Sequence, residues 1–163
     1  MDIGNLVKIT SRSWSLHILA SLNAGVPGRQ AALISATGAG RTAFTQSIEH
    51  NPGHGHPLRP EFRLTAPGIQ AARVAGTIIH TGAQTEAPAL LRRNWTVPVL
   101  AVCQKPRYFT EIRKDLSPVT DRALSQTLKK LHAHKWLCRV TDTASHPPRP
   151  AYRARNAGLT IGL

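Results

Sequence analysis

The stretch from Thr120 to Leu131 carries the side chains with the most evident chemistry. Leu124, Leu128 and Leu131 recur at helical spacing and predict one buried face. The opposite face is polar and cationic, and it consists of Thr120, Arg122, Ser125, Gln126, Lys129 and Lys130. Arginine and glutamine can donate hydrogen bonds to base edges, and lysine pairs with phosphate. The pattern therefore predicts a helix over 120–131 that contacts a nucleic acid duplex, with Thr120 and Ser125 reaching phosphate or base.

A β-hairpin is expected directly after this helix. Two runs rich in β-forming residues, Trp136 to Thr141 and Ala151 to Ala154, flank a proline-rich segment, 145–150, which we do not expect to pair as a central strand. Arg149 and Arg153 lie in or beside the second run and are expected to contact phosphates. The sequence thus predicts a wing over 136–154.

Two further helices are predicted before the cationic one. We expect Thr96 to cap the first, with Pro98 in its first turn. The second is short, with its apolar residues at i, i+3 and i+7: Phe109, Ile112 and Leu116. After a break at 117–119, Thr120 is placed to cap the third helix. Three helices and a wing make a winged helix-turn-helix, so the fold class is α+β and mainly helical.

Internal repetition predicts two copies of this unit. The matching segments are 56–63 with 146–153 at an offset of 90 residues, 14–20 with 95–101 at an offset of 81, and 43–48 with 123–128 at an offset of 80. We therefore divide the chain into three parts: residues 1–68, a degenerate winged-helix copy shorter by about ten residues; 69–91, a helical linker of a dimerisation type; and 92–163, a complete winged helix-turn-helix copy.

The first copy offers its own candidate contacts to DNA. They are Arg41, Thr42, Thr45 and Gln46 on its third helix, with Phe44 and Ile48 inward, and Arg59 and Arg63 in its wing region. A third helix that is cut near His50 loses a turn of packing, so we favour a platform role for this copy over weak DNA contact. The linker has apolar residues at helical spacing on either side of Gly82, and these are consistent with plain core packing or with pairing of the two copies.

Composition points to a polyanionic partner. Lys and Arg number 21 against 8 Asp and Glu, a formal net charge of +13, most of it in the second half of the chain. The 41% hydrophobic content is sufficient for a folded core. Two cysteines make no disulfide framework, Asp2 does not suit a signal peptide, and no apolar run is long enough for a membrane span. We expect a cytoplasmic protein with double-stranded DNA as partner, no membrane association and no cofactor.

Several other chemistries are weighed and not adopted. His50, His54 and His56 have metal-ligand spacing, as do His132 and His134, but no cysteine or carboxylate completes either site. The glycine-containing segment 38–42 lacks the lysine of a phosphate loop and is interpreted as a helix-turn-helix turn. Cys103 and Cys138 occupy apolar positions, where a redox-sensing role is the weaker interpretation. No catalytic arrangement is found, so we do not expect an enzyme.

Together these motifs resemble a known family. The segments that carry the resemblance are 95–100, 106–113, 116–120, 124–131 and 147–152. They are similar to the HxlR-type, MarR-related winged helix-turn-helix transcriptional regulators of bacteria, well over about 92–160 and in degraded form over about 10–68. The resemblance implies a dimeric regulator with its third helix in the major groove and its wing on the backbone or minor groove. Lys135 stands where this family has a glycine.

Three function classes follow. The leading hypothesis is a sequence-specific DNA-binding transcriptional regulator, with recognition helix 120–131 and wing 136–154. The alternatives are a non-enzymatic protein-interaction module on the same fold and a non-specific nucleic-acid-binding protein. The operator sequence, the direction of regulation, the inducing signal and the choice between a homodimer and an intrachain pseudo-dimer all stay open at the level of sequence.

Overall fold

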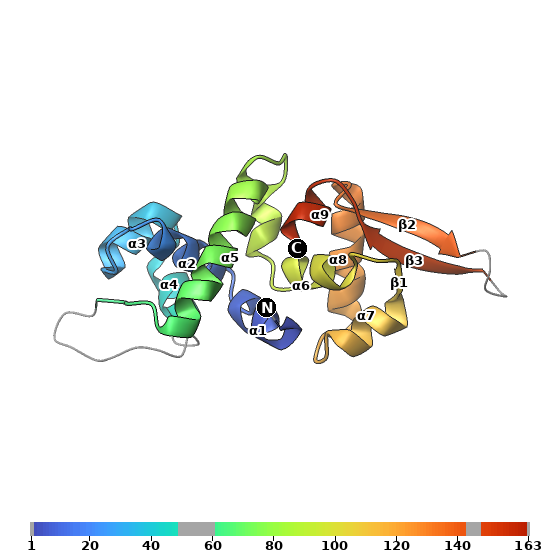
Figure 1. Ribbon diagram of the computed structural model, residues 1–163, viewed down its shortest axis with the longest axis horizontal. Helices are drawn as coiled ribbons and strands as arrows, with labels where there is room; N and C mark the ends of the chain where they lie inside the picture. Colours follow the sequence, from blue (N-terminus) through green and yellow to red (C-terminus); the bar gives the residue numbers. More distant parts are fainter. Residues whose placement is uncertain (1, 49–60, 143–147, 163) are drawn as a thin grey trace.

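The computed structural model describes residues 2–48, 61–142 and 148–162. The arrangement is elongated, with α2, α3 and α4 towards one end and a β-hairpin at the other (Figure 1). Helices α5, α1, α6 and α9 lie between the two ends. The predicted class is confirmed at the coarse level, since the described part of the chain is mainly helical and carries a small antiparallel sheet.

The N-terminal half consists of five helices in its described part. They are α1 (Ile3–Thr10), α2 (Ser15–Asn23), α3 (Gln30–Thr37), α4 (Arg41–Ile48) and the long α5 (Ala66–Ala83). Asp2 caps α1 by accepting a hydrogen bond from the Gly4 amide, and Thr65 caps α5 by accepting one from the Gly68 amide. Gly38 ends α3 at a φ of 72°, a left-handed conformation that favours glycine.

The C-terminal half contains the predicted order of three helices followed by a wing. Its elements are the 3₁₀ helix η1 (Pro88–Arg92), α6 (Thr96–Val102), β1 (Arg107–Tyr108), α7 (Phe109–Asp115), α8 (Asp121–Ala133), β2 (Leu137–Asp142), β3 (Arg149–Ala154) and α9 (Ala157–Ile161). The strand order is β1-β3-β2, with both pairings antiparallel. Strand β3 therefore lies in the middle of the sheet.

Two local expectations were wrong. Thr96 does not cap α6, because Trp95 occupies the cap position and Thr96 is the first helical residue, with only 1% of its surface exposed. Pro150 was placed outside any central strand, yet it pairs with Thr141 inside β3. The pairing is compatible with proline because β1 flanks β3 only at Ala151 and Tyr152, so the missing N–H of Pro150 faces no strand.

One apolar cluster runs through both halves of the molecule. It includes Leu16 and Leu19 of α2 and Ala72 and Ala75 of α5, and it continues to Leu100 of α6 and the leucines of α8. A second, smaller cluster around Leu33 and Phe44 holds α3 and α4 together. The ends of the molecule are therefore joined through a shared buried core.

Some expectations fall outside the described residues. These are Arg59, the histidines at 50, 54 and 56, and the tip of the wing at 143–147. The boundary expected between 68 and 69 falls within α5, and the break expected at Gly82 falls in the last turn of that helix. Within the described part of the chain, no three His, Cys, Asp or Glu side chains gather in a way that could hold a metal. Nor does any helix there have the length and apolarity to span a membrane.

Candidate nucleic-acid interface

Helix α8 is fixed by its cap and by its leucines. The Thr120 hydroxyl accepts a hydrogen bond from the Ala123 amide at 3.2 Å, as the sequence predicted. Leu124, Leu128 and Leu131 are all at most 3% exposed. Burying a leucine stabilises a fold by about 1.5–3 kcal/mol. The three leucines therefore determine which face of the helix is left to the solvent.

Ion pairs connect the elements around the turn that precedes α8. Arg113 of α7 pairs with Asp121 in the first turn of α8, and Arg107 of β1 pairs with Asp115 at 2.7 Å. Glu111 accepts a hydrogen bond from the Tyr108 amide at 2.9 Å and so caps the start of α7. Sequence reasoning did not single out Arg113, although its spacing of eight residues from Asp121 across a short turn is a usable signal.

The polar residues predicted on α8 share one exposed surface. Thr120, Arg122, Ser125, Gln126 and Lys129 are exposed, and Lys130 is half-buried; we call these six residues the α8 polar face. Among the described residues, none of Arg122, Lys129 and Lys130 forms an ion pair. Their charge is consequently available to an external anion.

The end of α8 directs the chain into the wing. Lys135 has a φ of 59°, its amide donates to the His132 carbonyl, and the Trp136 amide donates to the Leu131 carbonyl at 2.9 Å. These two hydrogen bonds form a Schellman motif with Lys135 at its left-handed position. Trp136, 3% exposed, then anchors the start of β2.

The wing presents both predicted arginines on one face of the sheet. Arg149 and Arg153 are exposed, and at positions i and i+4 of β3 they share a face with the buried Ala151 that lies between them. In the register of the sheet, Arg149 lies opposite Asp142 and Arg153 opposite Cys138. Val140 is 42% exposed on the same hairpin. The hairpin projects from one end of the molecule (Figure 1), and it carries the exposed side chains of Arg149 and Arg153.

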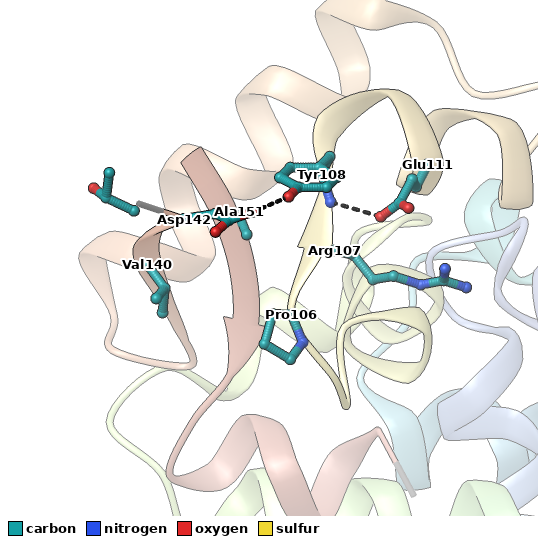
Figure 2. Close-up of a pocket in the computed structure, with 8 residues that line it drawn as sticks. Pro106, Arg107, Tyr108, Glu111, Val140, Asp142 and Ala151 are labelled. Atoms are coloured by element: carbon teal, nitrogen blue, oxygen red, sulfur yellow. Dashed lines mark hydrogen bonds between the residues drawn. The ribbon is translucent and has the colours of Figure 1, made fainter. Parts of the chain in front are cut away.

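A hydrogen bond at the base of the wing ties it to the helices. The Tyr108 hydroxyl of β1 donates to the carboxylate of Asp142 at the end of β2. The Tyr108 ring lies between Asp142 and Glu111, at the rim of a pocket of about 390 Å³, while the Arg107 side chain extends away from Asp142 (Figure 2). Sequence reasoning missed this contact because the two residues are 34 positions apart.

The candidate contacts of the N-terminal half occupy a comparable helix. Arg41, Thr42, Thr45 and Gln46 are all exposed on α4, while Phe44 and Ile48 are buried, as expected. Arg63 is exposed and pairs with Glu61 at 3.1 Å. The exposed side of α4 therefore combines one arginine with three hydrogen-bonding side chains.

The two cysteines differ in accessibility. Cys103 is fully buried, and burial raises the pKa of its thiol to about 12, although Arg107 acts in the opposite direction. Such a thiol is almost entirely protonated at neutral pH and reacts slowly. Cys138 is half-buried on β2, and its thiol donates to the Arg153 carbonyl at 3.5 Å.

Comparison with known families supports the resemblance for the C-terminal half of the chain. Residues 90–162 match the HxlR-like helix-turn-helix family. The matched HxlR-like segment runs from η1 to the end of α9 and so contains α8 and the wing. This is a regulatory DNA-binding family, and the match supports a helix-turn-helix regulator. The match covers less than half of the 163 residues. No curated protein and no solved structure shows significant similarity to the chain.

Proposed function

We propose that this protein is a sequence-specific DNA-binding transcription regulator that inserts α8 into the major groove and lays its wing on the DNA backbone. The observation that carries the proposal is the division of α8 into a leucine face that is buried and a polar face that is open to solvent. The HxlR-like match over 90–162 and the net charge of +13 agree with it.

The dimensions of the helix suit this role. Thirteen residues at about 1.5 Å each make a rod of roughly 20 Å. The major groove of B-DNA is about 12 Å wide and admits a helix of this kind. Recognition helices contact base edges through their N-terminal residues. In α8 the N-terminal end is the one capped by Thr120.

The side chains divide into two roles. Gln126 and Arg122 supply donors that can discriminate between bases in the major groove. Lys129, Lys130, Arg149 and Arg153 supply cations for phosphates, which fix register and orientation without selecting a sequence. Thr120 and Ser125 are short hydroxyl side chains that reach phosphate or base only at close approach.

Selection of bound fragments from genomic DNA tests the reading role. The wild-type protein should enrich a defined motif, and Gln126→Ala or Arg122→Ala should relax the preference at one or two base positions, with a loss of about 1–3 kcal/mol each. Gln70→Ala, at an exposed position on α5, is the matched control and should enrich the wild-type motif. An unchanged motif in both α8 variants would refute the assignment of α8 as the recognition helix.

Salt titration separates specific from general binding. Affinity for DNA should fall steeply as the salt concentration rises. Lys129→Ala should weaken binding to every duplex by a similar factor, and it should reduce the slope of log affinity against log salt concentration by about one. Equal affinity for every duplex would indicate a general nucleic-acid-binding protein instead. Absence of binding to any duplex would favour a protein-interaction module.

A further inference from the structure

Helix α2 of the N-terminal half and helix α6 of the C-terminal half begin in the same way. Trp14 precedes α2 with φ and ψ of −109° and −4°, and Trp95 precedes α6 with −99° and −4°. The next residues, Ser15 and Thr96, are 2% and 1% exposed. A sequence match at an offset of 81 residues (14 to 95) therefore coincides with a match in backbone conformation and burial.

Helices α4 and α8 also match in a side-chain hydrogen bond and in which residues are buried. The Ser47 hydroxyl donates to the Ala43 carbonyl at 2.8 Å, and the Thr127 hydroxyl donates to the Ala123 carbonyl at 2.8 Å. Both hydroxyl residues are buried. Phe44 takes the buried position that Leu124 holds in α8, at 1% and 0% exposure. Helix α4 thus buries the face that corresponds to the buried face of α8.

In each half, the residue before one short helix, α7 or α3, pairs with a later extended segment. In the C-terminal half, Tyr108 pairs with Ala151 in an antiparallel ladder. In the N-terminal half, Arg29 forms an antiparallel bridge with Glu61, and the Phe62 amide donates to the Gly28 carbonyl at 2.6 Å. A Cβ on Gly28 would lie 1.9 Å from the Phe62 carbonyl oxygen, so glycine is required for this approach. Glu61 and Ala151 stand at the same offset of 90 residues as the sequence repeat.

The halves meet through reciprocal contacts. Helix α1, which leads into α2, packs on α6 of the other half. In the other direction, the Arg92 guanidinium of η1, which leads into α6, lies 5.1 Å from the centroid of the Trp14 ring at the start of α2. Segment η1 also packs on α5. The two trailing helices, α5 and α9, contact each other. The contact of α5 with α9 joins equivalent helices, as a two-fold interface between identical subunits does, so the halves meet in an approximately two-fold way within one chain.

The exposed surfaces of the two helices are similar in type but not identical. Thr45 and Gln46 of α4 stand where α8 has Ser125 and Gln126. Arg41 stands where α8 has Asp121, and Thr42 stands where α8 has Arg122. Both surfaces can donate hydrogen bonds and carry positive charge. The differences in donor and charge position would select different bases.

From these observations we propose that a single chain is an internal pseudo-dimer and that α4 is a second DNA-reading helix, so that one protein molecule binds two non-identical half-sites on the same duplex. The proposal rests on the DNA-binding function proposed above for α8. It departs from the platform role favoured by the sequence, because α4 buries the face that corresponds to the buried face of α8, and the neighbouring helices of the two halves meet in an approximately two-fold way. Paired recognition helices read half-sites about one helical turn, or a multiple of it, apart.

A matched pair of substitutions tests the proposal. Fragment selection with the full chain should yield two unlike motifs at a fixed spacing. Gln126→Ala should weaken binding to one motif by about tenfold, and Gln46→Ala should weaken binding to the other by a similar factor. Gln70→Ala on α5 is the control for an exposed glutamine outside both helices.

The outcomes distinguish this inference from the function on which it depends. If Gln126→Ala alters one motif while Gln46→Ala selects the same DNA as the wild type, α4 is a platform and the pseudo-dimer proposal is overturned, with the function of α8 intact. If the wild type selects no motif, the DNA-reading function itself fails. Sedimentation of the complex gives an independent measurement: one chain per duplex with both motifs supports the proposal, and two chains per duplex overturn it.

Discussion

Lys135 occupies a backbone position that usually belongs to glycine. Its φ of 59° places a lysine in the left-handed region, which costs a residue with a Cβ about 1–2 kcal/mol. We therefore expect Lys135→Gly to raise the free energy of unfolding by about 0.5–1 kcal/mol, after allowance for the greater entropy of glycine in the unfolded chain. Urea denaturation followed by circular dichroism measures the change.

The same substitution within α8 is the control for Lys135→Gly. Lys129→Gly should lower the free energy of unfolding by about 1 kcal/mol, because the helix interior disfavours glycine. A loss of stability in Lys135→Gly comparable to that in Lys129→Gly would contradict the strain assigned to position 135.

His17 makes the junction between the halves sensitive to acid. Burial, and secondly the charge of Arg92, lower the pKa of this imidazole below its ordinary value of 6.5. Its Nδ1 is buried without a hydrogen-bond partner among the described residues. The imidazole ring packs edge-on against the Trp14 ring, with the two ring centroids 5.4 Å apart. Below pH 6.5 the unfolded chain takes up a proton that the folded chain resists, so the free energy of unfolding should fall as the pH drops from 6.5 towards the lowered pKa.

Substitution separates His17 from the other titrating groups. His17→Gln should flatten the loss of stability between pH 7 and pH 5. Urea midpoints across this pH range provide the measurement. Parallel pH profiles for His17→Gln and the wild type would exclude His17 as the origin of the effect.

At the scale of elements, local signals predicted α6, α7 and α8, whereas α1 and α9 were not predicted. The Thr120 cap and the leucines of α8 depend on residues within one helix, and both are confirmed. Strand β1 was not predicted, because its two residues pair with β3 more than 40 positions away. The cap of α6 was misassigned because Thr96 has the right residue type but is buried one position later than the cap. Sequence patterns report local preference, and these features are determined by tertiary packing.

The hydrogen bond between Tyr108 and Asp142 should control how the wing is held. Tyr108→Phe removes the donor but keeps the ring, so the hairpin gains freedom that DNA binding must then restrict. A net hydrogen bond is worth about 0.5–1.5 kcal/mol, so we expect the affinity for a selected duplex to fall by about two- to tenfold. The base preference should not change, since α8 is untouched; fluorescence anisotropy and fragment selection measure the two properties.

A second tyrosine provides the control for the wing. Tyr152→Phe alters a neighbouring residue of β3 on the opposite face of the sheet from Tyr108. It should bind DNA like the wild type. If both variants lose affinity equally, the loss comes from removing any tyrosine hydroxyl of the sheet and is not specific to the hydrogen bond between Tyr108 of β1 and Asp142 of β2.

At the scale of the whole molecule, the shared apolar cluster should couple the stability of the two halves. Leu16 of α2 is 2% exposed in the cluster that continues to α8, whereas Leu33 of α3 is 0% exposed in the separate cluster with Phe44. Truncation of a buried leucine to alanine costs about 2–5 kcal/mol. Leu16→Ala should therefore accelerate amide hydrogen exchange in α8 as well as in α2, and Leu33→Ala should accelerate it mainly in α3 and α4. Exchange measured by mass spectrometry separates these patterns.

Unchanged exchange in α8 of Leu16→Ala would mean that the halves unfold independently, and the rigid spacing between α4 and α8 that two half-sites require would then lack its structural basis.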